Sequence, residues 1–387
     1  MALRIALSGF VVLVVAMGIG RFAFTPQVPL MIAAGQLTLT SAGLVAAMNY
    51  LGYLVGAWDA MRAHRFVETR LWLGITGAVA LTLLSAAAEN AVVHGLLRFV
   101  IGCMSGWSMV LIAAWTNERL GQLGKPGLSA AVFAGPGAGI ALSGLLAVYI
   151  QAKSLSAGAA WQIYGVLALV LIALVARYLP RSGQLHRPGT APEPLVLTAD
   201  LTRLVWSYSL AGFGYILPAT FLSQMAAVRF PGSLFAQFVW PIFGLAAVVG
   251  IALSILLRHT STANRRLAIV LWLQGAGVLA AWLLPGIGGL LTGGLLTGGL
   301  LVGGGFLCAV QLSLLYGREL APNHTRYMAG LLTTGYAIGQ LIGPVTSALS
   351  TWLTHRLEPA LGLAGIALFV GGALVWNRHA ERQQQSQ

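Results

Sequence analysis

Residues 18–29 read GIGRFAFTPQVP and put Arg21, a permanent positive charge, inside an apolar stretch near the N-terminus. A charge inside a bilayer costs several kcal/mol, so such a side chain faces the protein interior or a water-filled cavity. The apolar run is too long for a signal peptide and is interrupted by Arg21 and two prolines. We therefore expect an uncleaved first membrane helix.

The composition of the whole chain agrees with a membrane protein. The 387 residues are 58% hydrophobic and 8% charged, whereas soluble domains have about 25% charged residues. A membrane span needs about 20 mostly apolar residues. Twelve candidate spans follow from this criterion: 5–30, 40–61, 71–88, 92–115, 128–150, 160–179, 204–227, 234–257, 267–284, 290–315, 327–353 and 360–376.

The basic residues are distributed unevenly between alternate loops. With the N-terminus inside, seventeen of the 22 lysines and arginines fall on the cytoplasmic side, and only Lys153, Arg229 and Arg356 lie in outer loops. This asymmetry is the positive-inside rule. It predicts an even number of spans in the bacterial inner membrane, with both termini cytoplasmic. A net charge of +13 could suggest binding to nucleic acid, but this placement of the basic residues reflects membrane orientation, and we expect no nucleic-acid partner.

The only long polar connection runs from Arg181 to Asp200 and divides the spans into two sets of six. Landmarks recur in both sets: Glu118 and Glu319 close the fourth and tenth spans, and Gly-Pro pairs lie in the fifth and eleventh, at Gly135-Pro136 and Gly343-Pro344. Internal repeats of this kind place a transporter's binding site near the midplane, between the repeats. We predict an all-α membrane protein of 12 helices, with an N-terminal bundle at 1–180, a cytoplasmic linker at 181–201 and a C-terminal bundle at 202–387.

A second charge, Arg98, opens an RxxxGxxxG pattern in the fourth span. The spacing of four keeps Arg98, Gly102 and Gly106 on one helical face, where glycines let a neighbouring helix approach closely. Two interpretations stay open: a structural arginine bonded to backbone carbonyls, or an arginine that serves transport. Because Arg21 is also present, we favour the second. Two positive charges in the membrane favour an anionic substrate, since a cation would be repelled.

Uncharged polar residues are candidates for the rest of a binding cavity. Asn49 and Tyr53 are four residues apart and share a helical face, as do Tyr336 and Gln340. The predicted substrate-binding set is Arg21, Asn49, Tyr53, Arg98, Tyr215, Gln311, Tyr336 and Gln340. None of the nine acidic residues lies at mid-membrane, and the seven histidines fall at span ends or in loops. If transport is coupled to protons, Asp59, Glu118, Glu319 or the substrate must carry the proton.

Several motifs resemble the major facilitator superfamily. Gly20, Pro26 and Pro29 look like its first-helix motif. Residues 56–65, GAWDAMRAHR, are similar to its signature loop after the second helix, although Val55 and Arg62 stand where two glycines of that loop belong. The Arg98 pattern resembles a motif of drug and proton antiporters, and Gly135-Pro136 is similar to their fifth-helix motif. Residues 18–26 and 46–56 closely resemble the YbfB/YjiJ-type branch.

The resemblance implies two bundles that rock about a central site. It implies a role in coupling for Arg98 and a cytoplasmic charge latch, with Asp59 opposite the start of the eleventh span and Arg62 or Arg65 near Glu118. The predicted gating and coupling set is Asp59, Arg62, Arg65, Glu118, Glu319, Gly135, Pro136, Gly343 and Pro344.

We therefore expect a secondary active transporter that moves a small organic, anionic solute by alternating access, with proton-linked export favoured. Uptake of an organic anion together with a proton is the alternative. An alternative of another class is a membrane sensor or scaffold that binds a ligand without moving it. No nucleotide loop, metal-ligand spacing or nucleophile with a base is recognisable, so we expect no enzyme, metal or cofactor. The expected partners are a small-molecule substrate, protons and membrane lipids, with the chain acting as a monomer.

Overall fold

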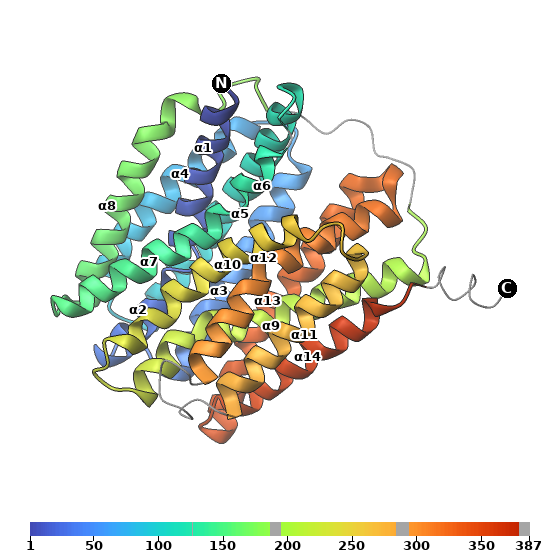
Figure 1. Ribbon diagram of the computed structural model, residues 1–387. Coiled ribbons are helices and arrows are strands. Elements are labelled where there is room, and N and C mark those ends of the chain that lie inside the picture. The colour runs from blue at the N-terminus through green and yellow to red at the C-terminus, as the bar shows by residue number, and fades with distance from the viewer. Residues whose placement is uncertain (126, 186–194, 284–293, 379–387) are drawn as a thin grey trace. The chain divides into compact units, whose positions relative to one another are not determined.

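The computed structural model describes residues 1–125, 127–185, 195–283 and 294–378 (Figure 1). Every regular element in these ranges is a helix. Eleven described helical stretches are long and apolar enough to cross a membrane. The remaining predicted span corresponds to α13 (Thr325–Thr354), whose 30 residues are also long enough to cross at about 1.5 Å per residue.

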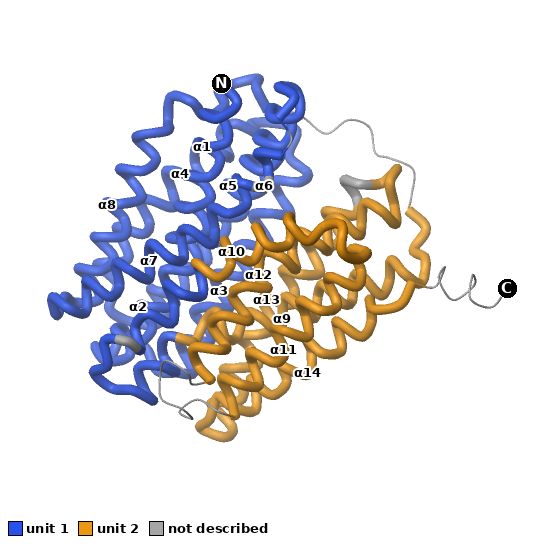
Figure 2. The backbone as a smooth tube through the Cα atoms, viewed as in Figure 1, with its two compact units in different colours: residues 1–190, 223–244 blue, residues 191–222, 245–387 orange. Residues whose placement is uncertain are grey.

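The chain forms two compact units, which Figure 2 shows in blue and orange. Unit 1 comprises residues 1–190 and 223–244. Its elements are α1 (Ala2–Leu13), η1 (Val14–Ile19), α2 (Phe24–Ala33), α3 (Leu39–Arg62), α4 (Val67–Leu84), η2 (Ser85–Ala87), α5 (Ala91–Gln122), α6 (Leu128–Val132), α7 (Gly135–Ala152), α8 (Ala157–Val175), η3 (Ala176–Tyr178) and η4 (Phe235–Phe238).

Unit 2 comprises residues 191–222 and 245–387. It takes most of α9 (Ala199–Arg229) and of α10 (Val239–Leu256), together with α11 (Ala263–Leu283), α12 (Gly294–Leu320), η5 (Pro322–His324), α13 and α14 (Glu358–Trp376). Residues 223–244, which the sequence predicts to lie in the C-terminal bundle, group with unit 1. The predicted linker at 181–201 begins after η3 and ends in the first residues of α9. Its residues 186–194 lie outside the described residues.

The first span is interrupted where Arg21 lies. Its middle part, η1, is a π-helix, and the backbone N–H of Gly20 donates to the Val15 carbonyl five residues earlier, at 2.9 Å. Regular α-helix resumes only at Phe24. A Cβ added at Gly20 would lie 2.6 Å from Ser105 Oγ, so glycine permits this close approach to α5. Such π segments are frequent at functional sites.

The predicted fifth span is two helices instead of one. α6 ends at Val132 and α7 begins at Gly135, with Pro136 in its first turn. Proline lacks an N–H and favours the first turn of a helix. Pro136 therefore lies in the first turn of a new helix, whereas the sequence placed it inside one continuous span at 128–150. The glycines of this motif pack against the first span, because a Cβ at Gly139 would lie 2.7 Å from the Cα of Gly18.

Four glycines hold α3 and α5 together in unit 1. Gly52 and Gly56 of α3 lie against the α5 backbone at Phe99 and Cys103, and Gly102 and Gly106 of α5 lie against the α3 backbone. A Cβ at Gly106 would come 2.7 Å from the Ala57 nitrogen. Small residues at such spacing let backbones touch. This contact brings Arg98 on α5 next to the polar face of α3.

A similar row of glycines joins α13 to α9 in unit 2. A Cβ at Gly339 would lie 2.8 Å from the Phe213 nitrogen, and one at Gly343 would meet the Ile216 side chain. The carbonyl of Pro344 accepts a hydrogen bond from Ser347 Oγ at 2.7 Å. Gly343, a member of the predicted gating and coupling set, therefore lies in a tight contact between helices of one unit.

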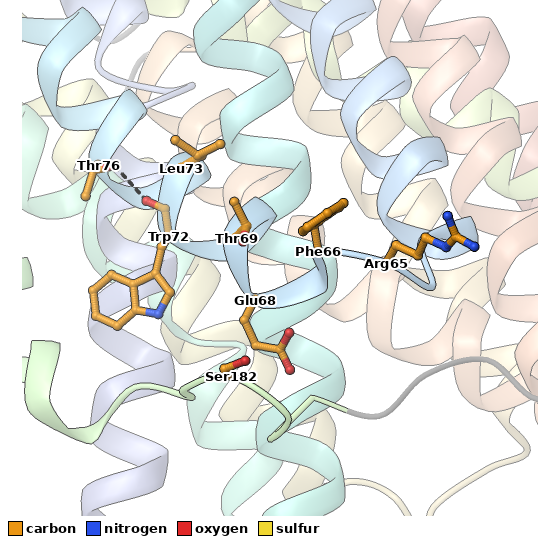
Figure 3. Close-up of a pocket in the computed structure, with 8 residues that line it drawn as sticks. All are labelled: Arg65, Phe66, Glu68, Thr69, Trp72, Leu73, Thr76 and Ser182. Atoms are coloured by element: carbon orange, nitrogen blue, oxygen red, sulfur yellow. Dashed lines mark hydrogen bonds between the residues drawn. The ribbon is translucent and has the colours of Figure 1, made fainter.

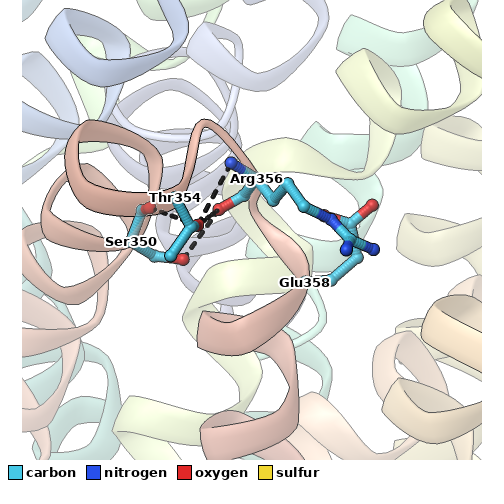
Figure 4. A network of polar contacts seen from close by, with 4 residues as sticks. All are labelled: Ser350, Thr354, Arg356 and Glu358. Carbon is cyan, nitrogen blue, oxygen red and sulfur yellow. Dashed lines mark hydrogen bonds and ion pairs between the residues drawn. The ribbon is translucent and has the colours of Figure 1, made fainter.

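At its C-terminal end α13 stops at a left-handed residue, His355, with φ of 58°. The hydroxyls of Ser350 and Thr354 donate to the Arg356 carbonyl at 2.7 and 3.2 Å (Figure 4), which satisfies a backbone acceptor beyond the helix end. The Arg356 side chain lies 3.6 Å from Glu358 and is largely exposed. Exposed pairs of this kind contribute little stability, so Arg356 is a suitable site for control substitutions.

Candidate functional site

Arg98 is a buried cation with spare hydrogen-bonding capacity. Its side chain is 1% exposed, and its guanidinium carbon lies 4.6 Å from the centre of the Trp161 ring on α8. Nη1 donates a long hydrogen bond, 3.4 Å, to the carbonyl of Gly20 at the break in the first span. Nε and Nη2 have no hydrogen-bond acceptor among the described residues. Buried donors are nearly always paired in native proteins, so this guanidinium is suited to receive another acceptor.

Arg21 lies among aromatic rings in the same unit. It is 2% exposed, and its guanidinium carbon is 4.1 Å from the centre of the Tyr53 ring, 5.0 Å from that of Tyr50 and 5.2 Å from that of Phe22. Cation–π contacts of this length stabilise a desolvated guanidinium by up to about 2 kcal/mol. The break in the first span thus holds Arg21 against the face of α3 that carries both tyrosines.

Asn49 connects α3 to the backbone of Arg98. Its Nδ2 donates to the Arg98 carbonyl at 2.8 Å, and its side chain is 2% exposed. Its Oδ1 is buried and has no hydrogen-bond donor in the described part of the chain. Unit 1 thus brings together all four of its predicted binding residues: Arg21, Asn49, Tyr53 and Arg98.

Unit 2 contains a continuous stack of four aromatic rings. Tyr215 stacks on Phe306 at 4.8 Å between ring centres and on Tyr336 at 5.5 Å, and Tyr336 stacks on Tyr208 at 4.3 Å. Gln340 Nε2 donates to the Tyr215 hydroxyl at 2.7 Å. The predicted residues Tyr215, Tyr336 and Gln340 therefore form one buried cluster. Phe306 and Tyr208, which the sequence did not single out, complete it.

Gln311, the remaining predicted binding residue, lies on α12 in the same unit. Its Oε1 is buried and has no hydrogen-bond donor within the described ranges. It is thus an acceptor that a ligand donor or a water molecule could satisfy.

His94 is a site residue that the sequence did not reveal. It lies in the first turn of α5, where the sequence places it at a span end, but it is 1% exposed and its Nε2 is 2.9 Å from Gln36 Oε1. It stands one helical turn before Arg98, whose charge acts on the ring. The spacing of four between His94 and Arg98 is the signal that could have identified it.

The loop acid Asp59 has partners other than the predicted ones. Its Oδ2 accepts from Arg70 Nε at 2.7 Å and from Trp107 Nε1 at 2.8 Å. Arg70 also donates to the Arg65 carbonyl. The cluster therefore joins the end of α3 and the start of α4 to the middle of α5 within unit 1. Arg70, which the sequence analysis did not select, is its central cation.

The other predicted latch residues of unit 1 also have local partners. The Arg62 guanidinium lies over the Trp58 ring, 4.5 Å from its centre, and Glu118 Oε1 accepts a weak bond from Gln122 Nε2 at 3.4 Å. These contacts are within one helix in each case. They differ from the predicted approach of Arg62 or Arg65 to Glu118.

A pocket of about 590 Å³ lies next to the loop between α3 and α4. It is lined by Arg65, Phe66, Glu68, Thr69, Trp72, Leu73, Thr76 and Ser182 (Figure 3). Glu68 is buried there and accepts the backbone N–H groups of Gly183 and Leu185, at 2.8 and 3.2 Å. An acid that binds two backbone donors fixes the segment carrying them. Glu68 therefore anchors the start of the predicted linker to α4.

In unit 2 the predicted coupling acid Glu319 forms an ion pair at the end of α12. Its Oε2 lies 2.5 Å from Arg378 Nη2, and the Arg378 guanidinium carbon is 4.9 Å from the centre of the Tyr316 ring. Arg378 follows α14, so this pair ties the end of α14 to the end of α12.

The helical membrane-spanning fold is that of the major facilitator superfamily, whose members are secondary transporters. The fold is similar to that in a crystal structure of a mutant of the nucleoside transporter NupG, with a TM-score of 0.71 and 13% sequence identity. The similarity covers 97% of this chain and 98% of the NupG chain. At that identity the likeness concerns the fold. No curated protein sequence matches the chain.

The chain belongs to the family described as "Uncharacterised MFS-type transporter YbfB", whose model matches residues 13–376. This assignment confirms the resemblance inferred from residues 18–26 and 46–56. The protein is an integral membrane transporter of that family.

Proposed function

We propose that this transporter moves a small organic anion by alternating access, and that Arg98 and Arg21 recognise the anionic group. The observation that carries the proposal is the buried Arg98 guanidinium, with two nitrogens that lack an acceptor among the described residues. A carboxylate accepts two parallel hydrogen bonds from a guanidinium. A cationic substrate would instead be repelled by both arginines.

The surroundings of the two arginines favour a particular kind of anion. Trp161 lies over Arg98, and Tyr50, Tyr53 and Phe22 surround Arg21. Binding pockets are mostly apolar, with a few polar groups that orient the ligand. We therefore expect a carboxylate attached to an apolar or aromatic body.

The antiporter-like motifs led us to expect proton-linked export, but His94 favours the alternative. A protonated His94 adds a positive charge one turn from Arg98, which strengthens anion binding. By linkage, a bound anion strengthens proton binding equally. Antiport instead requires the substrate and the proton to exclude each other. We therefore rank uptake of the anion together with a proton ahead of export.

The function is tested with purified protein in proteoliposomes and radiolabelled aromatic and aliphatic carboxylates under an imposed pH gradient. Symport predicts accumulation of the anion when the outside is acidic, and proton antiport predicts accumulation when the inside is acidic. Protein-free liposomes and the surface variant Arg356→Gln are the controls. Binding without flux under either gradient would instead support a sensor or scaffold, and a preference for amines of matched size would contradict an anionic substrate.

The coupling is tested by measuring anion affinity against pH. Because His94 is buried beside Arg98, it takes up a proton only under acidic conditions. For the wild-type protein we therefore expect the affinity to rise by about threefold between pH 7 and pH 4.5, and toward tenfold below that, the effect of one nearby charge worth about 1.4 kcal/mol. His94→Gln should remove this dependence. His64→Gln, in the exposed loop after α3, should retain it. Affinity that falls on acidification would contradict symport and support antiport.

We further propose that the protein lies in the bacterial inner membrane as a monomer with both termini in the cytoplasm, on the support of its loop charge asymmetry. Labelling of single cysteines in alternate loops would test this orientation. The gating role of the loop cluster and of the Gly-Pro pairs stays a prediction.

A further inference from the structure

A basic pocket in unit 1 is lined by residues from the start of α1, the end of α5 and η3. Its volume is about 910 Å³. Four arginines line it, Arg4, Arg119, Arg177 and Arg181, together with one acid, Glu118. Within the described ranges none of these arginines forms an ion pair. Four cations facing one carboxylate leave an excess of positive charge that a bound anion would offset.

Neutral partners hold these arginines in position. Arg177 Nη2 is 2.6 Å from the Tyr178 hydroxyl, and the Arg4 and Arg177 guanidinium carbons lie 5.6 and 4.8 Å from the centre of the Tyr178 ring. Arg119 Nη1 donates to Gln122 Oε1 at 3.1 Å. A guanidinium has five N–H donors, so each arginine keeps donors for another acceptor.

Unit 2 contains a corresponding acid and arginine that form an ion pair with each other. Glu319 and Arg378 are 59 residues apart and form an ion pair at 2.5 Å beside Tyr316. Glu118 and Arg177 have the same separation in sequence, and Trp115 precedes Glu118 as Tyr316 precedes Glu319. In unit 2 the acid neutralises the arginine directly. In unit 1 the corresponding residues line the basic pocket instead.

We infer that this pocket binds the phosphate of an anionic phospholipid headgroup. Guanidinium groups bind phosphate oxygens in a bidentate manner. The pocket lies at helix ends, where a bilayer's headgroups are, and Trp115 and Tyr178 are residue types enriched at that depth. Ile5 and Leu179 give it an apolar side suited to the glycerol and acyl portion. Basic pockets between transmembrane helices bind anionic headgroups in this way.

The lipid site is tested by thermal unfolding of the full chain in detergent with added phosphatidylglycerol, phosphatidylcholine or soluble glycerol 3-phosphate. We expect phosphatidylglycerol alone to raise the unfolding midpoint by several degrees, and added salt to reduce the rise. An equal rise with phosphatidylcholine would overturn the inference. An equal rise with glycerol 3-phosphate would show a site for soluble phosphate esters and overturn the lipid source.

Two variants and a control connect the effect to the pocket. The double variant Arg4→Gln/Arg177→Gln should lose the rise, whereas Arg356→Gln should retain it. Gln122→Glu places a carboxylate beside Arg119, so it should raise the midpoint without lipid and shrink the response to phosphatidylglycerol. If the double variant does not fold, Gln122→Glu decides alone: an unchanged response in that variant contradicts the inference.

Discussion

Replacing Gly102 by alanine is expected to destabilise the protein strongly, although alanine is the better helix former by about 1 kcal/mol. A Cβ at this position would lie 2.9 Å from the Tyr53 nitrogen and 3.0 Å from the Asn49 carbonyl carbon, and would also meet the Asn49 oxygen. These are backbone atoms of α3, which cannot rotate away as a side chain does. The helices must separate, and we expect a net loss of about 1–3 kcal/mol.

Gly95 provides the matched control on the same helix. A Cβ there would lie 3.8 Å from Met48 Cγ, an ordinary contact, so Gly95→Ala should leave the unfolding midpoint unchanged or raise it. The measurement is the thermal midpoint of each detergent-solubilised variant, followed by size-exclusion chromatography. Equal midpoints for the two variants would show that α3 and α5 are not held at backbone contact by these glycines.

Much of this fold could be predicted because its determinants are local in the sequence. Long apolar stretches predict spans by length alone. The spacing of four between Arg98, Gly102 and Gly106 predicted one shared face, and all three do meet α3 or the first span. The same periodicity placed Asn49 with Tyr53 and Tyr336 with Gln340.

What could not be predicted is which distant segment supplies the partner. Trp161 meets Arg98 from α8, and Phe306 meets Tyr215 from α12. Both are apolar residues in apolar spans, where helical periodicity does not distinguish a core aromatic from a site aromatic. Asp59 was expected to lie opposite the start of the eleventh span, but Arg70 and Trp107, 11 and 48 residues away, bind it within unit 1. The packing of helices brings such partners together, and sequence spacing does not encode that packing.

Arg98→Gln is expected to weaken binding of a transported carboxylate by about 2–3 kcal/mol, or roughly 30- to 150-fold. The loss arises because the guanidinium supplies charge-assisted hydrogen bonds that glutamine cannot replace. Arg98→Lys should recover part of the affinity, since it restores the charge without the bidentate geometry. Affinity is measured by scintillation proximity binding in detergent, with Arg356→Gln as the control.

Two further measurements separate ligand recognition from a structural role of Arg98. The wild-type protein should prefer a carboxylate over its neutral amide, and Arg98→Gln should lose this preference. The same variant should also be as stable as the wild type without ligand, or more stable, because a buried charge with unpaired donors costs free energy in the empty site. A structural arginine gives the opposite result: the unfolding midpoint falls and the preference for the carboxylate persists. That result would leave the anion without its principal binding group and would contradict the proposed substrate class.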